Sequence, residues 1–237
     1  MLKRFFILVI TAFFVVSTVM GQSDDAEMSI EQSYMQEAIE MTMITELSRS
    51  DYRDQKMDAL KYIGRALERG NTNEELRTTL ETLSLEGTLI KVTQSKRLMN
   101  DYPEVRRQAA KYLGLVGTKE AKDALIKICN ADHEPMVLQE AVRSLGIIGL
   151  NDDDDAINTV VWVVDKYSNS DHPDSILAIA AIETLETFAI KYKKYDVTIP
   201  AIRRISDGPY IKAIQDRARQ AIINMRKSAA QGYRDQT

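Results

Sequence analysis

The feature that most constrains the fold is a pattern of residues that recurs along the chain at intervals of 32 to 50 positions. Residues 51–64 return as residues 101–114, where Asp, Tyr, Ala, Lys, Tyr and Gly occupy the same places 50 residues later. The apolar positions that continue from there return at three later places, after 32, 40 and 37 residues: 137–149, 177–189 and 214–222. Internal periods of this length are typical of solenoids, in which each repeat contacts only its neighbours.

The apolar residues of each unit are spaced as on one face of an α-helix. In the second unit they lie at offsets of 0, 4, 7, 8 and 11 residues: Val105, Ala109, Tyr112, Leu113 and Val116. Asp and Pro precede this face, as they do at a helix N-terminus, and a glycine follows it, as at a C-terminus. A second apolar helical face comes next, so each unit is predicted to be a hairpin of two helices. The hairpins must stack, because neither helix can bury its apolar face alone.

Gly114 and Gly146 lie in the middle of two predicted helices, where glycine costs about 1 kcal/mol relative to alanine. Gly64 occupies the equivalent position of the first unit. The recurrence of a residue that is unfavourable in a helix indicates that neighbouring helices approach each other closely at this position.

Residues 101–117, with the sequence DYPEVRRQAAKYLGLVG, resemble a HEAT repeat of the bacterial type also called the PBS-lyase HEAT-like repeat. The resemblance is strong over 101–149 and weaker over three further stretches: 51–69, 171–190 and 207–226. It implies an all-α fold, an α-α superhelix or HEAT-like solenoid of about five helical-hairpin units with an N-terminal capping helix. It also implies a binding scaffold whose second helices line the concave face. Some relatives attach or remove bilins, and nothing in this sequence marks that activity.

The resemblance further implies a ladder of ion pairs between repeats, formed by the Asp that begins a unit and the Arg that follows its first Val. Here the pattern carries over to four residues: Asp101, Arg106, Arg107 and Asp132. Ala178 stands at the arginine position of a later unit, so the ladder is expected to break there.

Residues 1–21 have the layout of a secretory signal peptide. Lys3 and Arg4 precede an apolar run from Phe5 to Met20, and polar residues follow Gly21. The run is shorter than the about 20 residues that a membrane-spanning helix needs. Cleavage is therefore favoured, with a retained membrane anchor as the alternative, and the mature protein is expected to be periplasmic or secreted by a bacterium.

The rest of the chain is predicted to form a capping helix, a repeat array and a frayed tail: 22–50, 51–227 and 228–237. The first interval of the array leaves room for an extra helix around residues 87–99. Residues 191–196 are expected to form an extended loop, and the last helix is expected over 210–227.

Composition and charge exclude several classes of function. The net charge is −4, and removal of residues 1–21 leaves 29 basic and 35 acidic residues, a net charge of −6. This charge argues against binding to nucleic acid and gives no general attraction to anionic lipid. A single cysteine, Cys129, excludes a disulfide framework, and its helical spacing with Leu125 predicts a small buried residue rather than a reactive thiol.

No catalytic motif is present, and we expect neither an enzyme nor a cofactor. The sequence has no GxSxG, no HExxH and no glycine-rich phosphate loop. His133 and His172 follow Asp at equivalent turns and could bind a metal, but helix-start roles are favoured because Tyr52 and Tyr102 fill the same place. The acidic stretch 151–155 could hold calcium, but its spacing favours a solvated helix start, so no metal is predicted.

The strongest candidate for a binding residue is Trp162. On a helical wheel it points about 150° away from the apolar face of its helix. Equivalent positions in the neighbouring units hold Ile126 and Arg203, and three basic residues flank the set: Lys127, Lys166 and Arg204. We expect these six residues to bind a protein or peptide partner, since aromatic and Arg side chains are common interface anchors. The alternative is that Trp162 packs against a neighbouring helix.

Two other functions stay open at this point. One is an accessory or lyase-like enzyme that uses the groove of the solenoid. The other is a structural envelope protein that an uncleaved N-terminal helix anchors in the membrane. A pocket with two or three converging polar groups would favour the enzyme over the scaffold.

Overall fold

The computed structural model describes residues 30–168 and 173–234. The chain divides into two compact units, Met1–Glu40 and Met41–Thr237. The described part of the first unit is the N-terminal half of one helix, α2. The predicted signal peptide, His172 and the start of the predicted capping segment lie outside the described residues.

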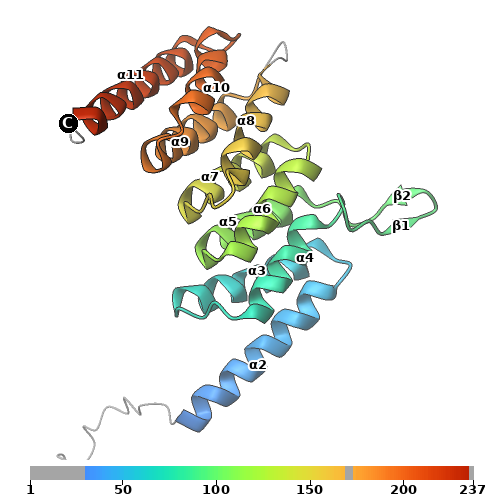
Figure 1. Cartoon of the computed structure of the whole chain (residues 1–237). Coiled ribbons are helices and arrows are strands. Elements are labelled where there is room, and N and C mark those ends of the chain that lie inside the picture. Colours follow the sequence, from blue (N-terminus) through green and yellow to red (C-terminus); the bar gives the residue numbers. More distant parts are fainter. Residues whose placement is uncertain (1–29, 169–172, 235–237) are drawn as a thin grey trace, which may run out of the picture. The chain divides into compact units, whose positions relative to one another are not determined.

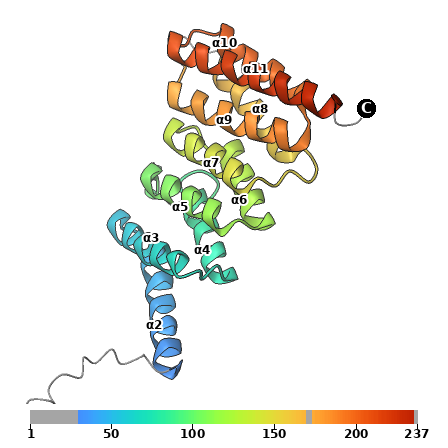
Figure 2. The same cartoon turned by 90° about the vertical axis from the view of Figure 1, so that its left-hand side faces the viewer.

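The described residues form ten helices and one small sheet. The helices are α2 (Ile30–Arg49), α3 (Arg53–Glu68), α4 (Glu74–Leu85), α5 (Pro103–Val116), α6 (Lys119–Ala131), α7 (Pro135–Ile148), α8 (Asp155–Tyr167), α9 (Ser175–Tyr192), α10 (Tyr195–Asp207) and α11 (Lys212–Arg234). In the second unit α3, α5, α7, α9 and α11 pack one against the next, and α4, α6, α8 and α10 form a second row beside them (Figures 1 and 2). The predicted all-α stack of helical hairpins is confirmed. Four pairs are complete, and the fifth unit is the single helix α11.

The helix termini follow the local sequence. Pro103 and Pro135 are the first residues of α5 and α7, where their missing N–H groups cost no hydrogen bond. Asp174 caps α9 by accepting hydrogen bonds from two backbone N–H groups, at 2.9 and 2.7 Å. Gly117 and Gly149 end α5 and α7 with φ of 73° and 65°, a conformation that glycine adopts without steric cost. Both predicted helix ends are confirmed.

The predicted apolar faces form one continuous core in the second unit. Val105, Ala109 and Leu113 of α5 are fully buried, as are their equivalents in α7. Cys129 lies in the same core and is also fully buried, which confirms its predicted role. Burial raises the pKa of its thiol to about 12, so the reactive thiolate is strongly disfavoured.

The recurring glycines lie where successive helices of the first row come closest. A Cβ atom added at Gly114 of α5 would lie 2.7 Å from Ser144 Oγ of α7, and one at Gly146 would lie 2.8 Å from Thr184 Oγ1 of α9. Gly64 of α3 faces the hydroxyl of Tyr112 in the same way. The close approach that the sequence indicated is therefore present between α5 and α7 and between α7 and α9, whereas at Gly64 the end of the Tyr112 side chain fills the space.

The prediction of an extra helix over 87–99 is wrong, because this segment forms a β-hairpin. Strand β1 (Thr93–Gln94) pairs antiparallel with β2 (Arg97–Leu98), and Ser95 and Lys96 form the turn with φ of 49° and 66°. Positive φ at both turn residues is the geometry that matches the twist of a two-residue hairpin. The β-branched residues that precede the turn favour extended backbone over helix.

Two other boundaries also differ from prediction. The loop expected over 191–196 is a turn of two residues between α9 and α10, because Lys193 adopts a left-handed conformation that ends α9. The last helix continues to Arg234, beyond its expected end at Lys227. Among the described helices, none is long and apolar enough to cross a membrane.

Candidate protein-binding face

Three of the six residues predicted to bind a partner lie at equivalent positions on successive helices of the second row. Ile126 is on α6, Trp162 on α8 and Arg203 on α10. The core-facing residues of α8, such as Val160 and Val163, are fully buried, whereas 39% of the Trp162 surface is exposed. Ile126 is half-buried and Arg203 is exposed. The row thus presents an aliphatic, an aromatic and a cationic side chain on three neighbouring helices.

Lys166 lies against Trp162, one helical turn away on α8. Its ammonium nitrogen is 4.6 Å from the centre of the Trp162 ring and 5.1 Å from that of Tyr167. A cation over an aromatic face at these distances is attracted by the ring's electrons, a contact worth about 0.5 to 1 kcal/mol at an exposed site. Trp162 thus presents a partly exposed indole with a lysine ammonium beside it.

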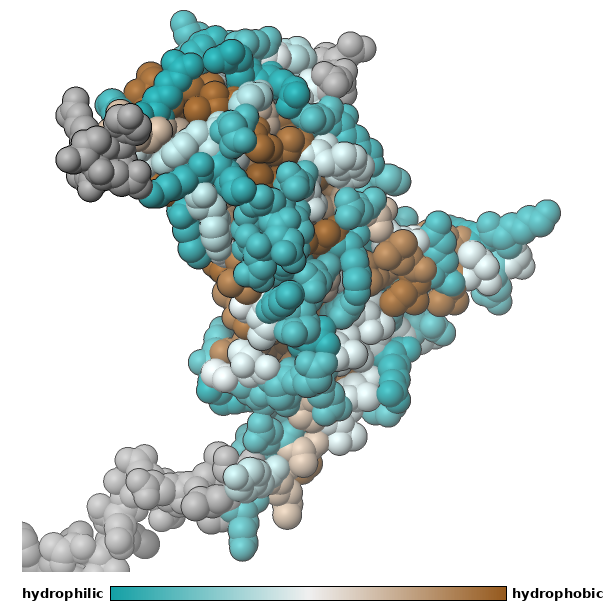
Figure 3. Space-filling model, in the orientation of Figure 1, coloured by the Kyte–Doolittle hydropathy of each residue, from teal (hydrophilic) through white to brown (hydrophobic). Residues whose placement is uncertain are grey.

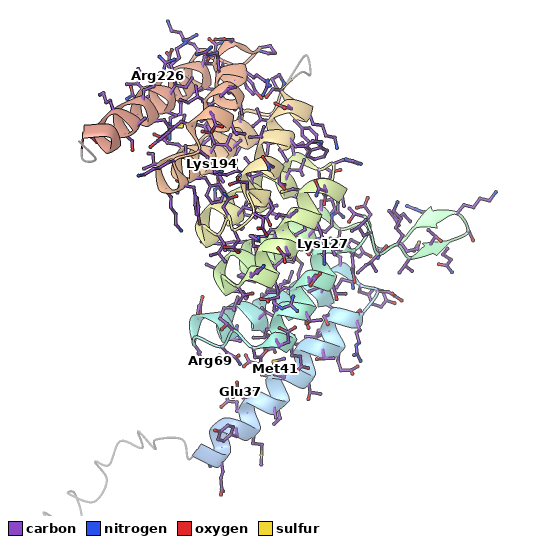
Figure 4. All side chains as sticks on the ribbon, viewed as in Figure 1. Glu37, Met41, Arg69, Lys127, Lys194 and Arg226 are labelled. Atoms are coloured by element: carbon purple, nitrogen blue, oxygen red, sulfur yellow. The ribbon has the colours of Figure 1, made fainter. Side chains whose placement is uncertain are left out.

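The other two flanking cations are paired with acids of the preceding helix in the row. Lys127, labelled in Figure 4, donates to Glu81 of α4 at 2.7 Å, and Arg204 donates to Asp165 of α8 at 2.5 Å. These pairs tie adjacent second helices together. Arg203 has no ion pair among the described residues and is exposed, so its guanidinium is available to a partner.

Three of the four residues of the expected ladder meet near the start of α5: Asp101, Arg106 and Asp132. Arg106 donates to Asp132 at 2.6 Å, to Asp101 at 2.7 Å and to the backbone oxygen of Glu86 at 3.3 Å, with only 3% of its side chain exposed. Burial would lower the pKa of Arg106, but the two carboxylates outweigh burial and raise it. Arg107 makes only a long, half-exposed contact of 3.6 Å with Glu140.

A second buried pair, which was not predicted, extends this ladder. Lys56 of α3 donates to Glu86 at 2.7 Å and to the backbone oxygen of Ser48 at 2.9 Å. Lys56 precedes Arg106 by the same 50 residues that relate the first two units. The repeat therefore indicated that Lys56 occupies the position equivalent to Arg106. Burial raises the pKa of Glu86 although Lys56 acts in the opposite direction, and its Oε2 atom has no hydrogen-bond partner.

A cleft of about 510 Å³ lies beside this pair. It is lined by residues of α2 and α4 and by the residue that follows α4: Thr45, Ser48, Arg49, Glu75, Thr78, Thr79, Thr82, Leu83 and Glu86. Three of its hydroxyl groups donate to carbonyl oxygens of their own helices, at 2.8 to 3.0 Å. These hydroxyl protons are therefore used within the helices rather than aimed at a ligand.

Of the metal candidates, His133 and the acidic stretch 151–155 lie within the described residues. His133 is exposed, and its Nδ1 atom lies 3.5 Å from the hydroxyl of Tyr167. In the acidic stretch, Asn151 donates to Asp154 and accepts from the backbone of Ile157, as expected for a helix start. In the part of the chain that the structure describes, no group of three or more His, Cys, Asp or Glu residues could hold a metal ion.

Comparison with protein families identifies the repeat. The family model for HEAT repeats matches residues 95–186. This segment carries HEAT repeats. It extends from the β-hairpin into α9, so it includes Ile126 and Trp162, and Arg203 lies beyond it. HEAT repeats generally serve as scaffolds for binding proteins. A search of curated proteins and a search of solved structures each found no match.

Proposed function

We propose that this chain is an exported, non-enzymatic HEAT-repeat scaffold of the bacterial type, and that it binds a protein or peptide through the row of second helices. Ile126, Trp162 and Arg203 make the central contacts. In the arrangement that the family resemblance implies, this row is the concave face. The export signal in residues 1–21 would place the protein in the periplasm or outside the cell.

The observation that carries this proposal is the partly exposed indole of Trp162, with the ammonium group of Lys166 beside it. Aromatic and Arg side chains dominate the binding energy of protein interfaces. Lys127 and Arg204 border the face, and each is paired with an acid of the preceding second helix.

The alternative of a lyase-like enzyme depends on a pocket with converging polar groups. The cleft between α2 and α4 presents Arg49 and Glu75, but several of its hydroxyls are committed to helix backbone. This lining favours the scaffold. The third possibility, a protein anchored by an uncleaved N-terminal helix, is distinguished by the N-terminus of the mature chain, which the proposal places near Gln22.

The test is cross-linking of the native protein in whole cells, followed by purification of the cross-linked partner. Trp162→Ala and Arg203→Ala should each weaken binding of the purified partner at least about tenfold. The melting temperature of Arg203→Ala should stay close to the wild-type value because its side chain is exposed. That of Trp162→Ala should fall only slightly, because the indole is partly exposed. Leu115→Ala, an exposed apolar residue of the first row, is the matched control and should leave binding unchanged.

Two results would contradict the proposal. One is a Trp162→Ala variant that melts several degrees lower with binding intact, which would make the indole a packing residue. The other is a partner whose affinity none of these substitutions changes. Recovery of the protein in the cytoplasm with residues 1–21 still attached would contradict only the export part of the proposal.

A further inference from the structure

The β-hairpin between α4 and α5 projects from the helices as a separate arm, here called the hairpin arm and defined as residues 87–100 (Figure 1). Four of its apolar side chains are between 40% and 61% exposed: Leu89, Ile90, Val92 and Met99. Figure 3 shows apolar surface on the stem of the arm and hydrophilic surface at its tip. A contiguous exposed apolar patch of this kind is typical of an interaction site.

The charge of the hairpin arm is of one sign. It contains Lys91, Lys96 and Arg97 and no acidic residue, although the chain as a whole has a net charge of −4. All three cations are exposed, and none has an ion pair within the described ranges. Buried or bridging cations elsewhere, such as Lys56, Arg106 and Arg204, are each paired with a carboxylate. The arm therefore presents three uncompensated positive charges next to apolar surface.

The base of the hairpin arm is firmly held. The buried side chain of Asn100 donates to the backbone oxygen of Ile90 at 2.8 Å and accepts from the backbone N–H of Val92 at 2.9 Å. Arg106, the centre of the ion-pair ladder, donates to the backbone oxygen of Glu86 just before the arm begins. The base of the arm is thus held by hydrogen bonds within the arm and by one contact from the repeat array, which lowers the entropy cost of binding there.

The strands of the arm have open edges. β1 and β2 pair with each other, and neither has a second neighbour among the described strands. An open edge presents N–H and C=O groups to which an extended segment can add as a further strand. Side chains of the added strand would then lie beside those of the arm.

We propose that the hairpin arm is a second docking site, which binds an extended protein segment in which acidic and apolar side chains alternate. The open edge would pair with the backbone of that segment. The four exposed apolar side chains of the arm, here called the stem patch, would contact its apolar side chains, and the three cations of the arm would contact its carboxylates. This site shares no residue with the Trp162 face and does not depend on it. A membrane surface fits the arm less well, because the polar tip with Ser95 and Lys96 would enter a bilayer before the apolar stem.

The test measures binding of a fluorescent peptide of about eight residues that alternates valine and glutamate. The full chain should bind this peptide, and a peptide with lysine in place of glutamate should bind at least about tenfold more weakly. The triple variant K91E/K96E/R97E should lose at least about tenfold in affinity for the glutamate peptide and gain affinity for the lysine peptide. The variant L89S/V92S should also bind the glutamate peptide more weakly, since the stem patch contributes to the contact.

The matched control is K111E/K119E/K212E, which makes the same change of net charge at three exposed lysines outside the arm. It should keep the wild-type affinity for the glutamate peptide. Melting curves of all variants should overlap, because every substituted side chain is exposed.

Three results would overturn the proposal. The first is no binding of the glutamate peptide by the wild-type chain, and the second is equal loss of binding in the arm variant and the matched control. The third is binding of the arm to vesicles of phosphatidylglycerol and phosphatidylethanolamine, abolished by K91E/K96E/R97E, without binding of the peptide. That result would assign the arm to an anionic lipid surface instead.

Discussion

Gly114 of α5 lies directly against Ser144 of α7, so closely that a Cβ atom at position 114 would be 2.7 Å from the serine Oγ. Ser144 is the counterpart of Tyr112 in the next unit, and Thr184 is its counterpart one unit later. Each of the three recurring glycines therefore faces the same position of the following repeat. At Gly114 and Gly146 the absence of a side chain lets successive helices of the first row come this close, and at Gly64 it makes room for the Tyr112 ring.

Gly114→Ala is expected to destabilise the protein by about 1 to 3 kcal/mol, although alanine is the better helix former. The added methyl group would meet both the side chain and the Cα of Ser144, and neither is the flexible end of a long side chain. Chemical denaturation of the purified variant gives the free energy of unfolding. Leu115→Ala, at an exposed position on the same helix, should change it by less than about 0.5 kcal/mol.

The double variant Gly114→Ala, Ser144→Gly tests the cause of this loss. Its destabilisation should be smaller than the sum of the two single changes, because removal of the serine side chain makes room for the new methyl group. Additive effects would mean that the two residues do not compete for the same space.

Ser144 also provides a prediction of the opposite sign. Its hydroxyl is buried and has no hydrogen-bond partner, whereas the equivalent hydroxyl of Thr184 donates to the backbone oxygen of Val142 at 3.0 Å. Ser144→Ala should therefore leave the melting temperature unchanged or raise it, and Thr184→Val should cost about 0.5 to 1.5 kcal/mol. Thermal melts of the two variants side by side are sufficient, and a larger loss for Ser144→Ala than for Thr184→Val would be inconsistent with this assignment.

The buried ion pair of Arg106 and Asp132 should be far more important for stability than the neighbouring exposed pair. Asp132→Ala leaves the guanidinium of Arg106 buried with one carboxylate fewer, and we expect a loss of about 3 to 5 kcal/mol in the free energy of unfolding. Arg107→Ala removes a contact of 3.6 Å from a half-exposed side chain and should cost less than about 1 kcal/mol. Similar losses in the two variants, measured by denaturation, would contradict a structural role for the buried pair.

Much of this architecture is readable from the sequence because the repeat is local. The spacing of Val105, Ala109 and Leu113 defines a helix face, and Gly117 and Gly149 mark helix ends that the structure confirms. The glycines at 114 and 146 indicated the close interfaces as well, since only a packing requirement explains glycine in the middle of a helix.

The structural features that were not predicted depend on contacts between residues distant in sequence, or on segments that depart from the repeat pattern. The hairpin arm replaces an expected helix because the repeat pattern has no counterpart for residues 87–99, and only local propensity could have indicated strands there. Lys56 and Glu86 are 30 residues apart, and an acid that follows a second helix has no fixed place in the repeat. Exposure of Trp162 was inferred from a helical wheel, but its contact with Lys166 also depends on side-chain conformation.

The pH dependence of stability should reveal the buried pair of Lys56 and Glu86. Burial raises the pKa of Glu86 above its ordinary value of 4.5, so the folded state holds this proton more tightly than the unfolded state does. Glu86 therefore contributes stability that is fully present below about pH 4.5 and is lost as the pH rises through the folded-state pKa.

Glu86→Gln removes this titration and keeps the shape of the side chain. The unfolding free energy of the wild type minus that of the variant should become smaller as the pH rises from about 4 to 7. Denaturant unfolding at several pH values measures it. Lys56 loses its buried partner in the variant at every pH, which shifts the difference by a constant but does not change its slope in this range. If this difference instead becomes larger as the pH rises, Lys56 outweighs burial and lowers the pKa of Glu86. The direction in which the difference changes with pH therefore determines whether burial or Lys56 dominates at this site.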